Sequence, residues 1–427
     1  MNEHTTTDRT SRAASVQKVI TPGGIEAWLV EDYAVPLIAF DFAFKGGNSQ
    51  DPDGKPGTAT MLAGLLDEGA GPLDSDAFHR ALDEKAIEIA FSADRDSFSG
   101  RMQSLSRNID RAFELLRLAV TDARIDADPL ERVRAQLNAG LRREINDPDS
   151  MAGKKWREIA YPGHVYGRPT RGTLETLPNL TREDLVAMRS TILARDSLKI
   201  AVVGAIDAVR LAKHIDDVFG ALPAKGNLIT IPDVTMQGVG TRHVIDLDVP
   251  QATIRFGRPG IARHDPDFVP AFVVNHILGG GVFTARLFNE VREKRGLAYS
   301  VYSQLQTNDH SNMLIGATST KNERAAESLT VIQEQIANLG ADGPTEDELD
   351  KAKKYLTGSY ALRFDTSTKI ASQLVHLQME GFDVDYLDQR NSHIQNVTLD
   401  EAKRVAARLF GDGQLLVTVV GKPEGLI

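Results

Sequence analysis

The sequence predicts an α+β protein of two similar halves, each a mainly antiparallel sheet with helices packed on one face. Two observations carry this prediction. The 427 residues exceed the length of one ordinary domain. The segment at 179–207 is repeated at 396–424, which begins 217 positions further along. Each copy has a threonine N-cap with an acidic residue three positions on, a helix, a polar turn and a β-branched strand ending in V-V-G.

Periodicity and turn signals give the elements of the first half. In chain order they are two strands around a turn within 25–46, a helix at about 58–67, the loop E-G-A-G, a helix at about 74–85, a strand at about 87–92, and helices at about 107–121 and 127–145. The second half matches this order more loosely. It has a strand at 251–257, a helix at about 266–278, the loop L-G-G-G, a helix at about 282–295, a strand at about 297–305, and helices at about 323–339 and 346–363.

A linker is predicted between the halves. The stretch "GALPAKGNLITIPDV", from residue 220, is rich in glycine and proline and lacks periodicity. We therefore expect an N-terminal domain at 1–219, a linker at 220–240 and a C-terminal domain at 241–427. Two similar halves joined in this way can close around a cavity.

Composition excludes several classes of protein. The net charge of −10, without a strong basic stripe, makes nucleic acid and anionic membranes poor partners. No apolar run approaches the roughly 18 residues of a membrane span. The absence of cysteine removes disulfides, thiol nucleophiles and thiolate metal sites. The first fifteen residues, "MNEHTTTDRTSRAAS", lack an apolar core, so we expect no signal peptide in this chain.

Common catalytic motifs are missing. The ten histidines are scattered without H-E-x-x-H, although a zinc site built from distant residues stays open. The segment "GKPGT" fails as a phosphate loop, because Ser49 stands where glycine is required and Pro56 follows the lysine. The pattern G-x-S-x-G does not occur.

The most informative segment is "GGGVFTARLFNEVREKRGLAYSVYSQ", residues 279–304. Gly279, Gly280 and Gly281 are candidates for an anion cradle, a hinge or a close backbone approach. The spacing predicts one apolar helix face, made of Phe283, Leu287 and Val291.

Arg292 and Tyr299 are predicted to flank a sharp helix-to-strand corner at Gly296. Brought together there, a guanidinium and a phenol can donate hydrogen bonds to a carbonyl oxygen or a developing oxyanion. The alternative is that Arg292 only interacts favourably with the helix dipole and that Tyr299 has only a packing role.

These residues carry a resemblance. "LGGGVFTARLFNEVREKRGLAYSV" resembles the glycine-rich loop and Arg/Tyr segment of the pitrilysin/insulinase-like zinc metallopeptidases, in their mitochondrial processing peptidase-like bacterial two-domain branch. "YPGHVYGRPTRGTLETLPNLTREDL" and the paired V-V-G strands also match. The resemblance spans nearly the whole chain. It implies two similar α+β domains that enclose a peptide chamber.

The family's zinc motif is degenerate in this chain. The family has H-x-x-E-H after a turn like "DPDGKPG". In this register, Thr60 stands at the first histidine, Ala63 at the glutamate and Gly64 at the second histidine. The distal glutamate falls near Gly140 or Leu141, with Glu144 close but out of register. The resemblance therefore implies no metal in this chain and no activity alone.

Arg292 and Tyr299 keep the family spacing of seven. The resemblance implies that they bind substrate and the tetrahedral intermediate beside the zinc of a partner subunit bearing H-x-x-E-H, with Gly279, Gly280 and Gly281 also binding substrate. A structural scaffold subunit and a peptide-binding clamp without hydrolysis are the alternatives. Unstructured peptides are the expected substrates. The resemblance favours the bacterial periplasm, and the cytoplasm is the alternative.

Overall fold

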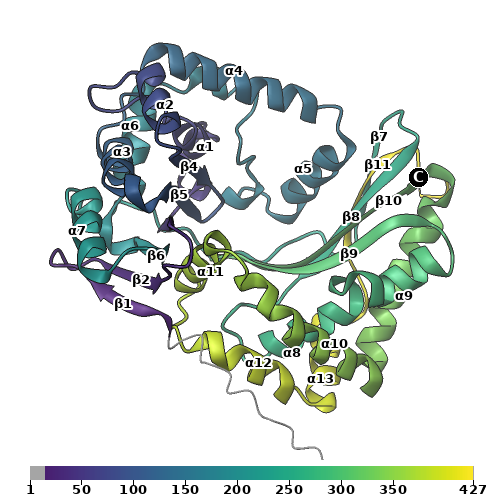
Figure 1. The fold of residues 1–427 in the computed structure, drawn as a ribbon. Helices are drawn as coiled ribbons and strands as arrows, with labels where there is room; N and C mark the ends of the chain where they lie inside the picture. The colour runs from purple at the N-terminus through teal and green to yellow at the C-terminus, as the bar shows by residue number, and fades with distance from the viewer. Residues whose placement is uncertain (1–14, 427) are drawn as a thin grey trace, which may run out of the picture.

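The computed structural model describes residues 15–426, apart from the side chain of Val282. Residues 1–14, on which the expectation about a signal peptide mostly rests, lie outside this range. Figure 1 shows two sheets side by side, each with helices against it, so the predicted α+β fold of two halves is confirmed. Within residues 15–426, no helix combines the length and apolar character that crossing a bilayer requires.

The first sheet has the strand order β1-β2-β6-β3-β5-β4. Its strands are β1 (Gln17–Ile20), β2 (Glu26–Glu31), β3 (Leu37–Lys45), β4 (Glu88–Ala93), β5 (Ser97–Leu105) and β6 (Lys199–Gly204). The two strands predicted within 25–46 are β2 and β3, but they are not neighbours, because β6 lies between them. Only the β2–β6 pair is parallel among these strands.

The second sheet repeats this topology without the extra edge strand. Its order is β7-β11-β8-β10-β9. Its strands are β7 (Arg242–Asp246), β8 (Gln251–Pro259), β9 (Ala298–Thr307), β10 (Asn312–Lys321) and β11 (Leu416–Gly421). Strand β11, the second V-V-G strand, takes the place of β6 and is likewise parallel to one neighbour, β7. The internal repeat in the sequence is therefore a repeat of the fold.

The helices follow the predicted duplication. The first half contains α1 (Thr58–Ala63), α2 (Ser75–Asp83), α3 (Ile109–Thr121), α4 (Ala127–Glu144), α5 (Pro148–Ala160), α6 (Arg182–Ile192) and α7 (Ala208–Phe219). The second contains α8 (Phe268–Asn275), α9 (Ala325–Asp342), α10 (Glu346–Gly358), α11 (Ser367–Met379), α12 (Tyr386–Asn396) and α13 (Leu399–Phe410). Capping boxes begin α6 at Thr181 and α13 at Thr398, as the repeated motif predicts.

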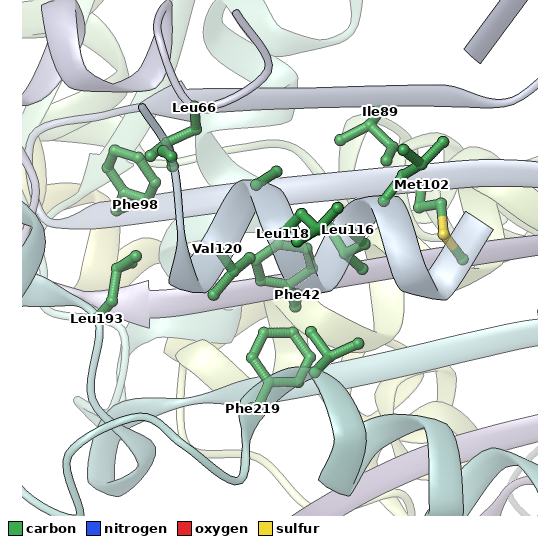
Figure 2. Close-up of a cluster of buried hydrophobic side chains, with 14 of the residues drawn as sticks. Phe42, Leu66, Ile89, Phe98, Met102, Leu116, Leu118, Val120, Leu193 and Phe219 are labelled. Carbon is green, nitrogen blue, oxygen red and sulfur yellow. The ribbon is translucent and has the colours of Figure 1, made fainter. Parts of the chain in front are cut away.

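Alternation along β3 divides the first sheet into two different faces. Phe40, Phe42 and Phe44 are buried against the helices of the first half. In Figure 2, Phe42 lies directly opposite Phe219 at the end of α7, and their ring centroids are 5.2 Å apart. Edge-to-face aromatic contacts of this kind add to the burial energy of the core.

The other face of the first sheet is covered by α11 from the second half (Figure 1). Small side chains, such as Ala43 of β3 and Ala201 of β6, line this face, and Leu374 packs against them. The amide of Gln378 donates a hydrogen bond of 2.9 Å to the carbonyl of Ile200. Small residues let the helix approach the sheet closely.

The reverse exchange places α5 of the first half on the second sheet. The Trp156 ring is fully buried, and its Nε1 donates to the carbonyl of Leu416 at 3.3 Å. Gly257 of β8 makes room for this ring, because a Cβ there would lie 2.7 Å from Trp156 Cζ2. Each sheet thus has its own helices on one face, as predicted, and one helix from the other half on the second face.

The predicted linker, 220–240, runs without helix or strand from the end of α7 towards β7. Ile229 exchanges backbone hydrogen bonds with the side chain of Gln50, and the N–H of Gln237 donates to the carbonyl of Ala160. The domain limits of 219 and 241 stay a prediction, because α5 and α11 each pack on the sheet of the other half.

Candidate functional site: a closed half-site and an exposed arginine–tyrosine pair

The turn before α1 is built around the carboxylate of Asp51. This carboxylate accepts hydrogen bonds from the N–H groups of Gly57, at 2.7 Å, and Ala59, at 2.8 Å. It therefore satisfies donors at the beginning of the helix, as a capping side chain does. Burial raises the pKa of Asp51 to about 6, even though these hydrogen bonds favour the charged form.

Thr60, at the first degenerate metal-ligand position, is engaged inside its own half. Its hydroxyl accepts from Asn48 Nδ2 at 3.0 Å and donates to the carbonyl of Thr170 at 2.8 Å. Asn48 Nδ2 also donates to that carbonyl, at 2.8 Å. The hydroxyl therefore serves a local hydrogen-bond network.

Ala63 and Gly64, at the other two motif positions, differ in burial, because Ala63 packs in the core and Gly64 is exposed. Ala63 is buried, and Gly64 ends α1. A Cβ on Gly64 would lie 3.2 Å from Val133 Cγ1 of α4, so a side chain there would require the Val133 side chain to shift.

The position of the distal glutamate lies against the side chain of Arg171. At Gly140, a Cβ would lie 3.0 Å from Arg171 Nη2. Glu144, the carboxylate nearest to the expected register, forms a 2.5 Å ion pair with Arg171.

These residues do not fit a zinc ion. Structural and catalytic zinc sites use thiolate, imidazole and carboxylate ligands, whereas α1 offers a hydroxyl, a methyl group and a glycine. Within the described part of the chain, no three His, Cys, Asp or Glu residues cluster closely enough to hold a metal ion.

The corner predicted between Arg292 and Tyr299 is present. Arg292 lies in the π-helical segment η9 (Phe288–Glu293), and its carbonyl accepts from the N–H of Gly296 at 2.9 Å. Gly296 has φ of +58°, a left-handed conformation that favours glycine and turns the chain into β9.

This corner brings Arg292 and Tyr299 into contact. The guanidinium carbon lies 4.6 Å from the Tyr299 ring centroid and 4.8 Å from that of Phe288, which are cation–π distances. The nearest carboxylate, Glu293, lies 3.6 Å from Arg292 Nε.

Tyr299 is 81% exposed. Its hydroxyl has no hydrogen-bond partner among residues 15–426. The Tyr299 ring therefore lies at the surface and packs on the Arg292 guanidinium, not in the core. The stacked ring holds the guanidinium in place, while the phenol and the guanidinium can both donate to an external oxygen.

The glycine loop approaches β9 closely. A Cβ on Gly279 would lie 2.5 Å from both the nitrogen and Oγ of Ser303. Ser303 in turn donates to Asn275 Oδ1 at 2.8 Å, which ties the end of α8 to β9. The π-helical segment η7 (His276–Gly280) continues α8, so Gly279 and Gly280 end a helix, and Gly281 joins it to a short 3₁₀ turn. Substrate binding by Gly279, Gly280 and Gly281 stays a prediction.

The helix expected at 282–295 is wrong in detail. A short 3₁₀ turn, η8 (Val282–Thr284), precedes the π-helical η9. This change of helix type leaves Phe283 72% exposed, and Phe288 joins Leu287 and Val291 in the buried face.

Several residues of the closed half-site were not predicted from the sequence. Asp51 belongs to the D-P-x-G-K turn, so that motif is a signal for its capping role. Asn48, Thr170 and Arg171 meet α1 only through tertiary contacts, and no sequence signal marks them.

The fold and these positions point to a relative of the two-domain metallopeptidases in which α1 carries no zinc ligand. Residues 179–356 match the family model described as Peptidase M16 inactive domain. The chain is thus related to the M16 peptidases, and the resemblance drawn from its sequence is confirmed.

Individual relatives agree with this relationship. A crystal structure from Pseudomonas fluorescens, described as a peptidase M16 inactive domain, superimposes with a TM-score of 0.89 at 27% identity, covering 96% of this chain and 98% of that one. The "Non-peptidase homolog YmxG" of Helicobacter pylori is 25% identical over 87% of this chain and 86% of its own length. The "Mitochondrial-processing peptidase subunit beta" of Lentinula edodes is 19% identical over 89% of this chain and 84% of its own.

Proposed function

We propose that this chain is the non-catalytic subunit of a heteromeric zinc peptidase and that Arg292 and Tyr299 act in the active site of its partner. The observation that carries the proposal is the stacked pair at the η9–β9 corner, in which Tyr299 is 81% exposed and the only ion pair of Arg292 within the described chain is that with Glu293 at 3.6 Å. The partner is a homologous subunit with an intact H-x-x-E-H motif, and it holds the zinc.

The role of the pair follows from its donors. In peptide hydrolysis, negative charge develops on the carbonyl oxygen of the substrate, and preorganised donors stabilise that charge. The Tyr299 hydroxyl and the Arg292 guanidinium are such donors, and their stacking holds them together before substrate arrives. Loss of one donor of this kind typically costs about 10²–10³ in rate.

Assembly with a homologous subunit is supported by the name of the Lentinula edodes relative, a processing peptidase subunit. We propose unstructured peptides as the substrates of the assembly. The bacterial periplasm is the proposed compartment, with the cytoplasm as the alternative.

A peptide-binding clamp is the second candidate. Strand β9 is ten residues long and lies at the edge of the second sheet, where an extended peptide can add as a further strand. Such a clamp would bind peptides without hydrolysis by any partner. A pure scaffold, the third alternative, gives no reason for an exposed Arg292–Tyr299 pair.

Reconstitution tests the proposal. This chain and an H-x-x-E-H homologue encoded in the same genome are expressed separately and together, and cleavage of an unstructured peptide is measured for each chain and for the equimolar mixture. We expect hydrolysis by the mixture well above that of either chain. A mixture no more active than the homologue alone contradicts the proposal, and peptide binding without added hydrolysis favours the clamp.

A further inference from the structure

A cavity of about 620 Å³ lies between the two halves, away from the Arg292 corner. It is lined by the end of α4, one side of α5, the loop at 169–175 and parts of β7 and β8. Thr170 and Arg171, which contact the closed half-site, line it as well. Its volume is in the range of sites that hold small molecules or short peptide segments.

Two guanidinium groups from different halves converge in this cavity. Arg157 comes from α5, and Arg255 comes from β8. A Cβ on Gly153 would lie 3.4 Å from Arg157 Nη1 and 3.2 Å from the Cζ and Nη1 of Arg255. Both cations therefore lie beside the same point, and the glycine leaves room for them.

Their charge is only partly compensated. Arg255 Nη2 donates to the two carboxylate oxygens of Asp149, at 3.0 and 3.2 Å, whereas its buried Nε has no partner in the described chain. The Arg157 guanidinium forms neither a hydrogen bond nor an ion pair with any side chain of residues 15–426.

The other carboxylates of the cavity form no ion pair with Arg157. Glu144 pairs with Arg171, and Glu158 lies 3.9 Å from Lys155. Glu175 is exposed at the rim. Glu144 and Asp149 therefore act on Arg157 only through longer-range electrostatics.

Burial adds to this imbalance. Desolvation, and then the like charges of Arg95 and Arg255, lower the pKa of Arg157 to about 10. The side chain still carries its charge at neutral pH. A half-buried cation without a hydrogen-bond partner is costly, and an anion between Arg157 and Arg255 would relieve both their repulsion and the missing hydrogen bonds.

We infer that Arg157 and Arg255 form a binding site for a carboxylate of a peptide held between the halves. The planar guanidinium fork fits a carboxylate through paired hydrogen bonds. The carboxylate is either the C-terminus of the peptide or an Asp or Glu side chain. The choice of a peptide as ligand rests on the proposed function, whereas the oxyanion site rests on the two arginines alone.

Peptide binding to the isolated full chain tests the inference. The probe is a fluorescent, unstructured ten-residue peptide in four forms, with a free or amidated C-terminus and with an internal Glu or Gln. The proteins are the wild type, Arg157→Gln, Arg255→Gln and the control Arg111→Gln, which removes a half-exposed arginine paired with Glu114 on α3. We expect removal of the recognised carboxylate to weaken binding to the wild type and the control about tenfold or more. In Arg157→Gln this dependence should disappear.

The four peptide forms distinguish the two possible sources of the carboxylate. Sensitivity to amidation identifies the C-terminus, and sensitivity to Glu→Gln identifies a side chain. Equal responses of the wild type and Arg157→Gln to both changes would overturn the inference.

Inorganic phosphate gives a readout that needs neither peptide nor partner. Phosphate should raise the melting temperature of the wild type and of Arg111→Gln more than that of Arg157→Gln, and the same melting curves show that each variant is folded. Equal shifts in all variants would overturn the oxyanion site. Failure of the reconstituted hydrolysis assay leaves this measurement unaffected, so the two proposals fail separately.

Discussion

Helix α1 of the first half and the η9–β9 corner of the second half carry the two groups of candidate site residues. Their polar side chains differ in whether they have hydrogen-bond partners within the chain. Thr60 and Asp51 find partners within their own half. Tyr299 is 81% exposed, and its hydroxyl is unpartnered among the described residues. Hydrogen-bonded groups such as the Thr60 hydroxyl belong to the internal network of the folded chain. The exposed Tyr299 hydroxyl adds little to stability, so a ligand or partner explains it better.

The largest expected effect tests what joins the two halves. Trp156→Ala should lower the free energy of unfolding by about 3–5 kcal/mol, because it empties a fully buried site where α5 meets β8 and β11. Leu374→Ala, in the reciprocal helix α11, should cost about 2–5 kcal/mol. Urea unfolding measures both, with the exposed Ile20→Ala as control. A loss below about 1 kcal/mol for Trp156→Ala would mean that the exchanged helices do not hold the halves together.

Arg292→Ala should lower hydrolysis by the reconstituted complex about 10²–10³-fold, because it removes an oxyanion donor and frees Tyr299. Stability should change by about 0.5 to 1 kcal/mol, since the half-buried Arg292 contributes a 3.6 Å ion pair and cation–π contacts but no hydrogen bond to a side chain of residues 15–426. Arg295→Ala is the matched control, because Arg295 pairs with Glu290 near the same corner. Equal losses in both variants would point to a disturbed corner and not to a specific role of Arg292.

The two halves should also respond differently to pH. The folded pKa of Asp51 is raised to about 6 from 3.8, so its contribution to stability is present below pH 4 and is lost as the pH rises through 6. The Asp51→Asn variant does not lose stability in this way, because the amide does not ionise. Its stability relative to the wild type should therefore improve between pH 4 and 7, by on the order of 3 kcal/mol.

Asp267 of the second half is the control for this titration. Hydrogen bonds from Arg404 and Arg408 lower its pKa to about 2. Its contribution is present above pH 4 and is lost only as the pH falls towards 2. The difference between Asp267→Asn and the wild type should stay constant from pH 5 to 7. A constant difference for Asp51→Asn as well would show that Asp51 ionises normally.

The smallest effect concerns the closed half-site. Thr60→Val keeps the shape of the side chain but removes the hydroxyl between Asn48 and Thr170. Stability should fall by about 1 kcal/mol, since Asn48 still reaches the Thr170 carbonyl. Peptide hydrolysis by the complex should be unchanged. Thr330→Val, on the exposed side of α9, is the control for stability. A large loss of hydrolysis in Thr60→Val would mean that α1 still takes part in the reaction.

Much of the fold is predictable from the sequence because its signals are local. The capping boxes at Thr181 and Thr398 and the V-V-G strands mark the same unit twice within about 25 residues each. The exchange of α5 and α11 is not local. Trp156 and Gly257 are complementary in shape, but nothing in either segment identifies the other as its partner.

The candidate site divides in the same way. The adjacency of Arg292 and Tyr299 follows from a short helix, a glycine corner and a strand. The exposure of Tyr299 depends on what covers the edge strand β9, and a single sequence does not contain that information. Arg157 and Arg255 belong to different halves and meet only in the folded chain.

Tyr299→Phe tests the central claim most directly, because it removes one oxygen atom from an exposed side chain. Turnover of an unstructured peptide is measured for the complex of the H-x-x-E-H homologue with the wild-type chain, with Tyr299→Phe, and with Tyr302→Phe, a control on the same strand. We predict a fall of about 10²–10³-fold for Tyr299→Phe alone, with unchanged assembly. Equal turnover in all three complexes would contradict it.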